Sequence, residues 1–288
     1  MTFAVLAHSR SETNAGLVAA AESLGYSACL LPPRDALRYL EPGDVALGRL
    51  DVREGLDGIE SGIPELERLT SAGVRLLNPP GALVAAHDKL LTARVLRLSG
   101  VPHPHTWHIA EGMPTEAPEL PLVLKPRFGS WGRDVTLCRT QVELDNELDS
   151  LRFRGWFREH GVLAQELVPP QGWDLRLIVA GDRIAGAARR HAGPGEWRTN
   201  VSLGGYSEPA DPPPLARALA LSAAAAIGAD LVGVDLLPTA NGFLVAELNG
   251  AVDFRPQYAL GHGDVFQGVV AELLRAARDR GALSAVGA

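Results

Sequence analysis

Lysine is nearly absent from this chain: of its 27 basic residues, 25 are arginine and two are lysine, Lys89 and Lys125. In a chain that uses arginine wherever any cation will serve, lysine marks positions that need a compact ammonium on a flexible stem. Binding of a phosphate by a point charge is the commonest such role. Both lysines are therefore candidates for a phosphate site, and the alternative is that they are incidental.

Other scarce features exclude whole classes of protein. The two cysteines, Cys29 and Cys138, lack metal-ligand spacing, which favours core thiols in a reducing compartment. No apolar run approaches the roughly 20 residues of a membrane span, and the apolar opening is too short for a secretory signal. A net charge of −7 provides no basic footprint for nucleic acid. We expect a cytoplasmic protein that binds neither membranes nor nucleic acid.

The chain is long enough for two or three lobes, since 46% of its 288 residues are hydrophobic. Strand and helix signals alternate over residues 1–80, which predicts a small parallel α/β domain. A Pro-Gly turn signal at residues 78–81 follows it. We place a central lobe at residues 81–164 and a C-terminal lobe at residues 165–288. The predicted fold class is α/β with α+β lobes.

The segment around Lys125 is typical of a flap. An apolar run at residues 120–125 ends in this lysine, and a second strand-like run covers residues 134–138. Between the runs, Gly129 and Gly132 lack a Cβ, so backbone N–H groups can approach phosphate oxygens. A plain turn is the alternative. The loop is no P-loop, and no G-x-G-x-x-G motif follows the first strand.

A second polar cluster lies on two apolar runs near the C-terminus, with Asp235 before and Glu247 and Asn249 after an Asn-Gly hairpin signal at residues 241–242. A two-residue turn would point Asp235 away from Glu247. A three-residue loop over residues 240–242 with a glycine bulge pairs Asp235 with Glu247 and leaves Asn249 on the same face. The register of the hairpin therefore decides whether the three side chains meet.

Three oxygen donors on one face of apolar strands are costly to bury without a cation. Carboxylate and amide oxygens suit Mg²⁺ or Mn²⁺ held together with phosphates. We therefore predict a metal site at Asp235, Glu247 and Asn249. A solvent-facing hairpin with ordinary surface acids is the alternative. Together with a lysine-bearing flap, the metal site indicates binding of Mg·ATP.

These motifs and several others follow one another between residues 88 and 249, within a similarity that spans residues 1 to about 280. They are Asp88-Lys89-Leu, Leu124-Lys125-Pro, Gly129-Ser-Trp-Gly-Arg133, Gln165-Glu166, Asp174-Leu-Arg176, Arg190, Trp197-Arg-Thr-Asn200, Gly204-Gly205, Gly233-Val-Asp235 and Glu247-Leu-Asn249. In this set the chain resembles the ATP-grasp ligases of the RimK/LysX group. The Gly129–Arg133 loop resembles LysX, which joins an amino acid to the C-terminal glutamate of a small acidic carrier protein. Arg198-Thr-Asn200 instead follows RimK, the ribosomal-protein glutamate ligase, and Gly250 departs from the LysX pattern.

The resemblance implies an ATP-grasp fold preceded by a parallel pre-ATP-grasp domain, and an ADP-forming ligase that makes an amide through an acylphosphate. The residues it assigns to ATP are Lys89, Lys125, Gly129, Ser130, Trp131, Gly132, Arg133, Glu166, Leu167, Asp174, Arg198 and Asn200. Among these, Glu166 and Leu167 would contact adenine and Asp174 the ribose. Arg190, Arg198 and Asn200 would bind the acylphosphate and the acceptor carboxylate.

The implied cofactors are ATP and Mg²⁺ or Mn²⁺. The implied partners are an amino acid, a carboxylate substrate such as the C-terminal glutamate of a carrier protein, and further copies of the chain in a dimer or tetramer. A small-molecule dipeptide ligase without a protein acceptor stays open, because acceptor size depends on the rim of the cleft. A non-catalytic nucleotide-binding regulator is disfavoured, since both lysines and all three metal ligands are present.

Overall fold

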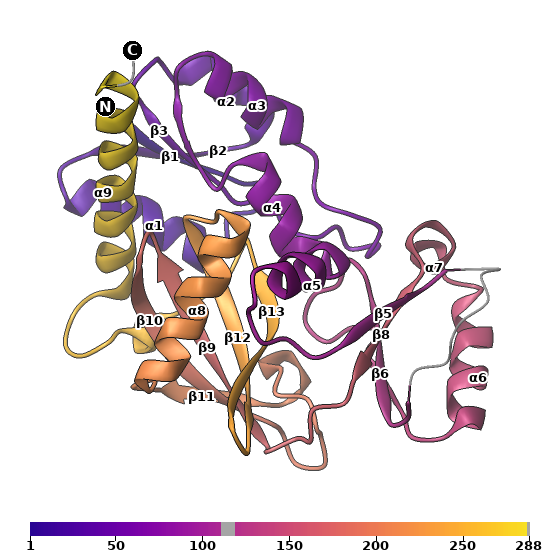
Figure 1. The fold of residues 1–288 in the computed structure, drawn as a ribbon. Helices are drawn as coiled ribbons and strands as arrows, with labels where there is room; N and C mark the ends of the chain where they lie inside the picture. Colours follow the sequence, from indigo (N-terminus) through magenta and orange to yellow (C-terminus); the bar gives the residue numbers. More distant parts are fainter. Residues whose placement is uncertain (111–118, 287–288) are drawn as a thin grey trace.

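Three sheets organise the described part of the chain (Figure 1). The computed structural model describes residues 1–110 and 119–286, with the backbone alone from residue 280 onward. Within those ranges, no helix has the length and apolar character needed to cross a membrane.

The first sheet is parallel, with the order β2-β1-β3-β4. Its strands are β1 (Thr2–Leu6), β2 (Ser27–Leu31), β3 (Val45–Gly48) and β4 (Arg75–Leu77), and its connections contain α1 (Glu12–Ser23), α2 (Pro33–Tyr39) and α3 (Ile63–Ser71). Phe3 and Val5 enter one core, and Ala4 and Leu6 enter another. A parallel strand that is buried on both faces is apolar along its length, which explains the continuous hydrophobic run at residues 3–6.

The second sheet is antiparallel, with the order β5-β8-β6-β7. It contains β5 (Thr106–Ile109), β6 (Leu122–Pro126), β7 (Thr136–Cys138) and β8 (Val162–Glu166), and α6 (Gln141–Leu151) and α7 (Gly155–His160) accompany it. Leu122 and Leu124 enter a core with residues of both helices. The alternate residues Val123 and Lys125 therefore face the other side, where they line a cavity. The predicted pairing of the two flap strands is confirmed.

The third sheet is also antiparallel, with the order β11-β10-β9-β12-β13. Its strands are β9 (Trp173–Ala180), β10 (Arg183–His191), β11 (Tyr206–Pro209), β12 (Leu231–Thr239) and β13 (Gly242–Asn249). The chain forms the short 3-10 turn η1 (Val201–Leu203) before β11, the helix α8 (Pro214–Ile227) before β12, and the 3-10 turn η2 (Pro256–Tyr258) after β13. One face packs against α8. The opposite face is apolar at one end, through Ile178 and Leu231, and charged at the other, through Asp174 and Arg190.

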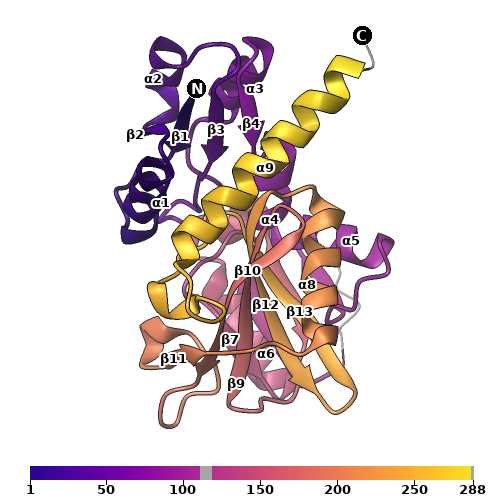
Figure 2. The same cartoon turned by 90° about the vertical axis from the view of Figure 1, so that its left-hand side faces the viewer.

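Packing crosses the predicted lobe boundaries at two places. The helices α4 (Pro80–His87) and α5 (Lys89–Leu98) contribute Ala85 and Leu96 to the core of the third sheet. The last helix, α9 (Val265–Val286), packs on α1 and joins the core that the first and third sheets share (Figure 2). Two of the hydrophobic cores therefore contain residues from more than one predicted lobe. The division at residues 1–80, 81–164 and 165–288 stays a prediction.

The hairpin of β12 and β13 brings the three predicted metal ligands onto one face, but its turn differs from the expected one. Asp235 pairs with Glu247, as predicted. The turn is a two-residue loop between Thr239 and Gly242, and the expected three-residue loop is wrong. The missing residue is supplied by a bulge at position 246 between the Leu236–Val245 and Asp235–Glu247 pairs. Without that extra residue, all three side chains could not share a face.

Gly233 permits the close approach of the chain after β13 to the sheet. A Cβ on Gly233 would lie 2.4 Å from Cγ2 and 2.9 Å from Cβ of the buried Val252. We predict that Gly233→Ala lowers the free energy of unfolding by about 1–3 kcal/mol through overpacking. Gly81→Ala in α4 is the control, because a Cβ there meets no atom within 4 Å. Urea unfolding of both variants tests this, and equal midpoints would contradict it.

Candidate active site at the junction of two cavities

Asp235 lies at the centre of a buried ion-pair network on the charged face of the third sheet. The register places it opposite Arg176 of β9, and Arg190 of β10 opposite Asp174. Both oxygens of Asp235 accept hydrogen bonds from Arg176 at 2.7 Å, and Arg190 Nη2 lies 2.9 Å from Asp235 Oδ2. Arg190 also donates through Nε to Asp174 Oδ1 at 2.8 Å. Charge-assisted bidentate pairs of this kind orient both partners.

The electrostatics of the network keep its groups charged. Burial by itself favours the neutral form of Asp235, but Arg176 and Arg190 outweigh it and lower the pKa of this carboxyl to about 2. Burial also opposes the charge of Arg190, yet Asp235 and Asp174 raise the pKa of its guanidinium above the usual value. Arg189, the preceding residue, lies over the ring of Trp173 at 4.6 Å. Of these two neighbours, Arg190 lines the cleft and Arg189 does not.

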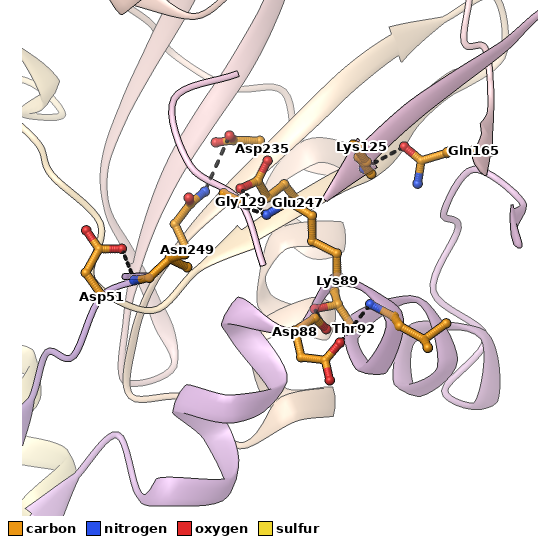
Figure 3. A network of polar contacts seen from close by, with 12 residues as sticks. Asp51, Asp88, Lys89, Thr92, Lys125, Gly129, Gln165, Asp235, Glu247 and Asn249 are labelled. Carbon is orange, nitrogen blue, oxygen red and sulfur yellow. Dashed lines mark hydrogen bonds and ion pairs between the residues drawn. The ribbon is translucent and has the colours of Figure 1, made fainter. Parts of the chain in front are cut away.

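Lys89 connects the hairpin to the flap. Its Nζ lies 3.2 Å from Glu247 Oε1 and donates a hydrogen bond of 2.5 Å to the carbonyl of Gly129 (Figure 3). Asp88 caps the first turn of α5 by accepting from the backbone of Leu90, and Arg127 pairs with the same carboxylate. The helix start that carries Lys89 is therefore anchored beside the flap strand.

The donor set on the hairpin fits a divalent cation. Asp235 and Glu247 supply carboxylate oxygens. Asn249 donates a hydrogen bond from its amide Nδ2 to Asp235 Oδ2 at 3.4 Å, so the amide oxygen of Asn249 takes no part in that bond. Asp235 Oδ1 accepts from Arg176 Nε alone, so a further lone pair remains for a ligand. No group of three His, Cys, Asp or Glu side chains that could hold a metal occurs in residues 1–110 and 119–286. A metal bound here would therefore need the amide of Asn249 as its third donor.

Lys125 projects into the cleft with a neutral partner. Its Nζ donates to Gln165 Oε1 at 2.8 Å, and Gln165 in turn donates to Thr106 Oγ1 at 2.8 Å. Burial lowers the pKa of Lys125 to about 8; Glu247 opposes this effect and the charge of Lys89 adds to it. A buried ammonium held by an amide is prepared for an anion that the protein does not itself provide.

Side chains of Lys89, Arg198 and Arg133 hold the flap loop in place through hydrogen bonds. Besides the contact from Lys89, Arg198 Nη1 donates to the carbonyls of Gly132 and Val135 at 3.1 Å. Arg133 donates to the Glu54 carbonyl at 2.7 Å, which connects the loop to the segment between β3 and α3. Gly132, at φ 70°, has a backbone conformation suited to glycine, and a Cβ there would meet Asn200 Oδ1 at 2.8 Å. These contacts hold the loop beside the cleft, which Gly129, Ser130, Gly132 and Arg133 line.

Two cavities meet at this network. The first is lined by most of the predicted residues: Lys89, Lys125, Gly129, Ser130, Gly132, Arg133, Glu166, Leu167, Asp174, Arg190, Arg198, Asn200, Asp235 and Glu247. The second is lined by the remaining two, Trp131 and Asn249. Both cavities are lined by Ser130, Arg190, Asn200, Asp235 and Glu247. The predicted set is thus brought together, although its residues occupy two connected spaces.

Two predicted residues make contacts other than the implied ones. Asp174 is 3% exposed, and its carboxylate already accepts hydrogen bonds from Arg190 and from Thr199 Oγ1. Arg198 pairs with Glu196 Oε2 at 2.8 Å in addition to its bonds with the flap. These contacts favour a positioning role for both side chains.

Sequence reasoning left Arg176 and Gln165 out of the site. Arg176 lies opposite Asp235 only because β9 neighbours β12, a pairing between strands far apart in the sequence. Gln165 reaches Lys125 because β8 pairs with β6. Asp174 and Arg176 are two residues apart on one strand, so their side chains lie on the same face. This alternation could have predicted that Arg176 belongs to the site. Gln165 was already part of the motif Gln165-Glu166, but no role in the site was assigned to it.

With this geometry in view, the chain can be compared with known proteins. The RimK-like ATP-grasp domain family matches residues 86–259. The chain belongs to this family. It is 32% identical over 198 residues to a Pseudomonas paraeruginosa protein named Probable alpha-L-glutamate ligase; the match covers 66% of this chain and 64% of that protein. It is 30% identical to the Glutamate--LysW ligase ArgX of Sulfurisphaera tokodaii, over 65% of this chain and 68% of that protein.

A solved structure supports the fold. The RimK domain protein ATP-grasp from Sphaerobacter thermophilus is similar with a TM-score of 0.66 at 22% identity, over 96% of this chain and 100% of that one. The predicted ATP-grasp fold of class α/β is confirmed. Membership of the RimK-like family agrees with the resemblance in the motifs, whereas a special relation to LysX stays a prediction.

The charge of Lys125 should oppose folding. The folded-state pKa of about 8 lies below the usual lysine value of 10.5, so the penalty is complete below pH 8 and disappears as pH rises toward 10.5. At about 1.4 kcal/mol per unit, the penalty is on the order of 3 kcal/mol. We predict that Lys125→Met is more stable than the wild type at pH 7 and that the difference shrinks by pH 9.5. Urea unfolding at both pH values measures it.

Lys89→Met is the control, since removal of this lysine leaves Glu247 without its 3.2 Å ion pair. It should give no comparable stabilisation at pH 7. A Lys125→Met protein that is less stable than the wild type at pH 7, or a difference that does not change with pH, would contradict the assignment of an uncompensated charge.

Proposed function

We propose that this protein is an ADP-forming carboxylate–amine ligase that uses ATP and Mg²⁺ and forms an amide through an acylphosphate. The observation that carries the proposal is the junction of the two cavities at Asp235, Glu247 and Arg190. A nucleotide in the first cavity would direct its terminal phosphate to this junction. A carboxylate in the second cavity could then reach the phosphate. The names of the relatives, which are glutamate ligases, agree with this chemistry.

The first cavity suits the nucleotide. Its walls include the apolar side chains of Val123, Val135 and Leu237, against which a purine can pack. Glu166 and Leu167 lie on the chain leaving β8 and would offer backbone groups to adenine. The resemblance implies a ribose contact for Asp174, but its bonds to Arg190 and Thr199 favour orienting Arg190 instead.

Lys89 and Lys125 would bind the phosphates. Phosphate oxygens would replace Glu247 and the Gly129 carbonyl as partners of Lys89, and Gln165 would hold Lys125 in place from behind. The loop over residues 129–133 would exclude water, which otherwise hydrolyses an acylphosphate. Its attachment through Arg198 and Arg133 supports that role.

Asp235, Glu247 and Asn249 would hold the metal, which would neutralise charge on the phosphates when bound. Arg190 and Asn200 line both cavities and would bind the developing acylphosphate. Arg190 is suited to this role because Asp174 and Asp235 fix its guanidinium. Electrostatic stabilisation by groups that need no reorganisation accounts for much of the rate in such reactions.

For the substrates, we propose an amino acid as the amine and a glutamate-like carboxylate at the end of a carrier protein or peptide. The relative named Glutamate--LysW ligase ArgX supports this choice. A dipeptide ligase acting on small molecules alone is the second candidate. A homo-oligomer stays a prediction from the family resemblance, and a cytoplasmic location stays a prediction from the composition.

Hydroxylamine provides the decisive assay. It traps an acylphosphate as a hydroxamate, so ADP and hydroxamate should appear together when the carboxylate is accepted. We would screen free glutamate and an N-acetylated peptide that ends in glutamate, each with ATP and Mg²⁺. Hydroxamate from the peptide favours the carrier-type acceptor, and hydroxamate from glutamate alone favours the dipeptide ligase. ADP formation without any hydroxamate across a wide carboxylate panel would overturn the ligase proposal.

Lys125→Arg tests the phosphate contact. The planar guanidinium retains the charge but cannot occupy the space of an ammonium that Gln165 holds in a buried position. We predict that hydroxamate formation falls about 10²–10³-fold, as for loss of one group that stabilises a charged transition state. Arg152→Lys, directly after α6, is the matched control, as this arginine lies on an exposed surface. Activity of Lys125→Arg within a few-fold of the control would remove Lys125 from the site.

A further inference from the structure

The amide of Gln165 must point one way to hold Lys125. Lys125 Nζ donates to Gln165 Oε1 at 2.8 Å, and both side chains are buried (Figure 3). An ammonium can only donate hydrogen bonds, so it requires the oxygen end of the amide. A reversed amide would place an NH₂ group against the ammonium, and the two donors would repel each other. The position of Lys125 therefore depends on the groups that fix the orientation of Gln165.

Thr106 accepts a hydrogen bond from the other end of this amide. Thr106 on β5 is the direct partner of Gln165 on β8, and Gln165 Nε2 lies 2.8 Å from Thr106 Oγ1. The hydroxyl hydrogen of Thr106 is used elsewhere, because the carbonyl oxygen of Pro104 lies 3.0 Å from Oγ1 and His103 Nε2 lies 3.3 Å from it. The oxygen therefore presents a lone pair to Gln165. An amide oxygen in the same place would be repelled.

His103 provides a second acceptor for the same NH₂ group. Its Nδ1 lies 2.6 Å from the carbonyl oxygen of Val245 on β13, so Nδ1 carries the proton and donates it. Nε2 then holds a lone pair, and Gln165 Nε2 donates to it at 3.4 Å. Burial lowers the pKa of His103 to about 4; the charge of Lys125 adds to this effect, and the bond to Val245 opposes it. The ring is therefore neutral at pH 7 and keeps its lone pair.

The bond from His103 to Val245 also connects two sheets. Lys125 lies on β6 of the second sheet, whereas Glu247 lies on β13 of the third, and both side chains line the first cavity. Val245 is two residues before Glu247, and its backbone N–H donates to the carbonyl of Pro102 at 2.9 Å. The segment before β5 is thus held against the hairpin of β12 and β13 by two hydrogen bonds.

We propose that His103 and Thr106 are positioning residues that fix the amide of Gln165. The fixed amide oxygen holds Lys125 in the first cavity, where its ammonium would meet the phosphates. Through its bond to β13, His103 aligns this lysine with the hairpin that carries the proposed metal ligands. The inference rests on the proposed binding of Mg·ATP in the first cavity.

Replacement of the Thr106 hydroxyl tests the inference. Thr106→Val keeps the shape and suits a β-strand, but it leaves Gln165 Nε2 without its 2.8 Å acceptor. The dissociation constant of Mg·ATP should rise about tenfold, the effect of weakening one charged hydrogen bond. Hydroxamate formation from the N-acetylated glutamate-ended peptide should fall about tenfold to a hundredfold, because the lysine is displaced. Thr106→Ser keeps the oxygen and should stay within a few-fold of the wild type in both measurements.

A Lys125→Met background shows whether Thr106 acts through Lys125. This background lacks the ammonium that Thr106 is proposed to position, and removal of a charge that burial opposes should leave the protein folded. In this background, Thr106→Val should change the dissociation constant of Mg·ATP less than about twofold, because residues that act on one contact are not additive. A general disturbance of the sheet would instead add the same factor in both backgrounds. His103→Phe, which keeps a ring and removes both nitrogens, should show the same pattern as Thr106→Val.

Three outcomes overturn the inference. They are a Thr106→Val protein that binds Mg·ATP as tightly as the wild type, a Thr106→Ser protein that is impaired as strongly as Thr106→Val, and an equal effect of Thr106→Val with and without Lys125. Failure of the ligase proposal looks different, because the wild-type protein would then bind Mg·ATP but form no hydroxamate from any carboxylate.

Discussion

The buried carboxylate of Asp235 is the constraint on which the site depends. A buried carboxylate is tolerated only with charged partners, and Arg176 and Arg190 provide them from the two strands that lie next along the sheet. Those pairs require the register of β9 with β10 and β12. They also orient Arg190 at the wall shared by both cavities. One ion-pair network therefore aligns the sheet, the proposed metal ligand and the proposed acylphosphate contact.

The flap and the hairpin could be predicted because each is local. The strands around Lys125 and the polar positions of β12 and β13 follow from alternation and glycine over short stretches. The scarcity of lysine pointed to two side chains that both line the first cavity. The turn itself was predicted wrongly because a bulge at position 246 and a three-residue loop produce the same pairing of Asp235 with Glu247.

The remaining features depend on long-range pairing, which a single sequence does not contain. Gln165 meets Lys125 only when β8 lies beside β6, and Thr106 meets Gln165 only when β5 lies on the other side of β8. The same is true of His103, which meets Val245 of the C-terminal hairpin and Gln165 of the second sheet. Polar groups that complete a site from a distant element carry no local pattern of their own.

The central claim is that a carboxylate attacks the terminal phosphate at the junction of the two cavities. Transfer of oxygen tests it most directly. A peptide whose C-terminal glutamate carries ¹⁸O in its carboxyl groups would be incubated with ATP, Mg²⁺ and an amine, and the released phosphate analysed by mass spectrometry. The account predicts one ¹⁸O atom in each phosphate released with an amide bond. Amide formation that leaves the phosphate free of ¹⁸O would contradict it.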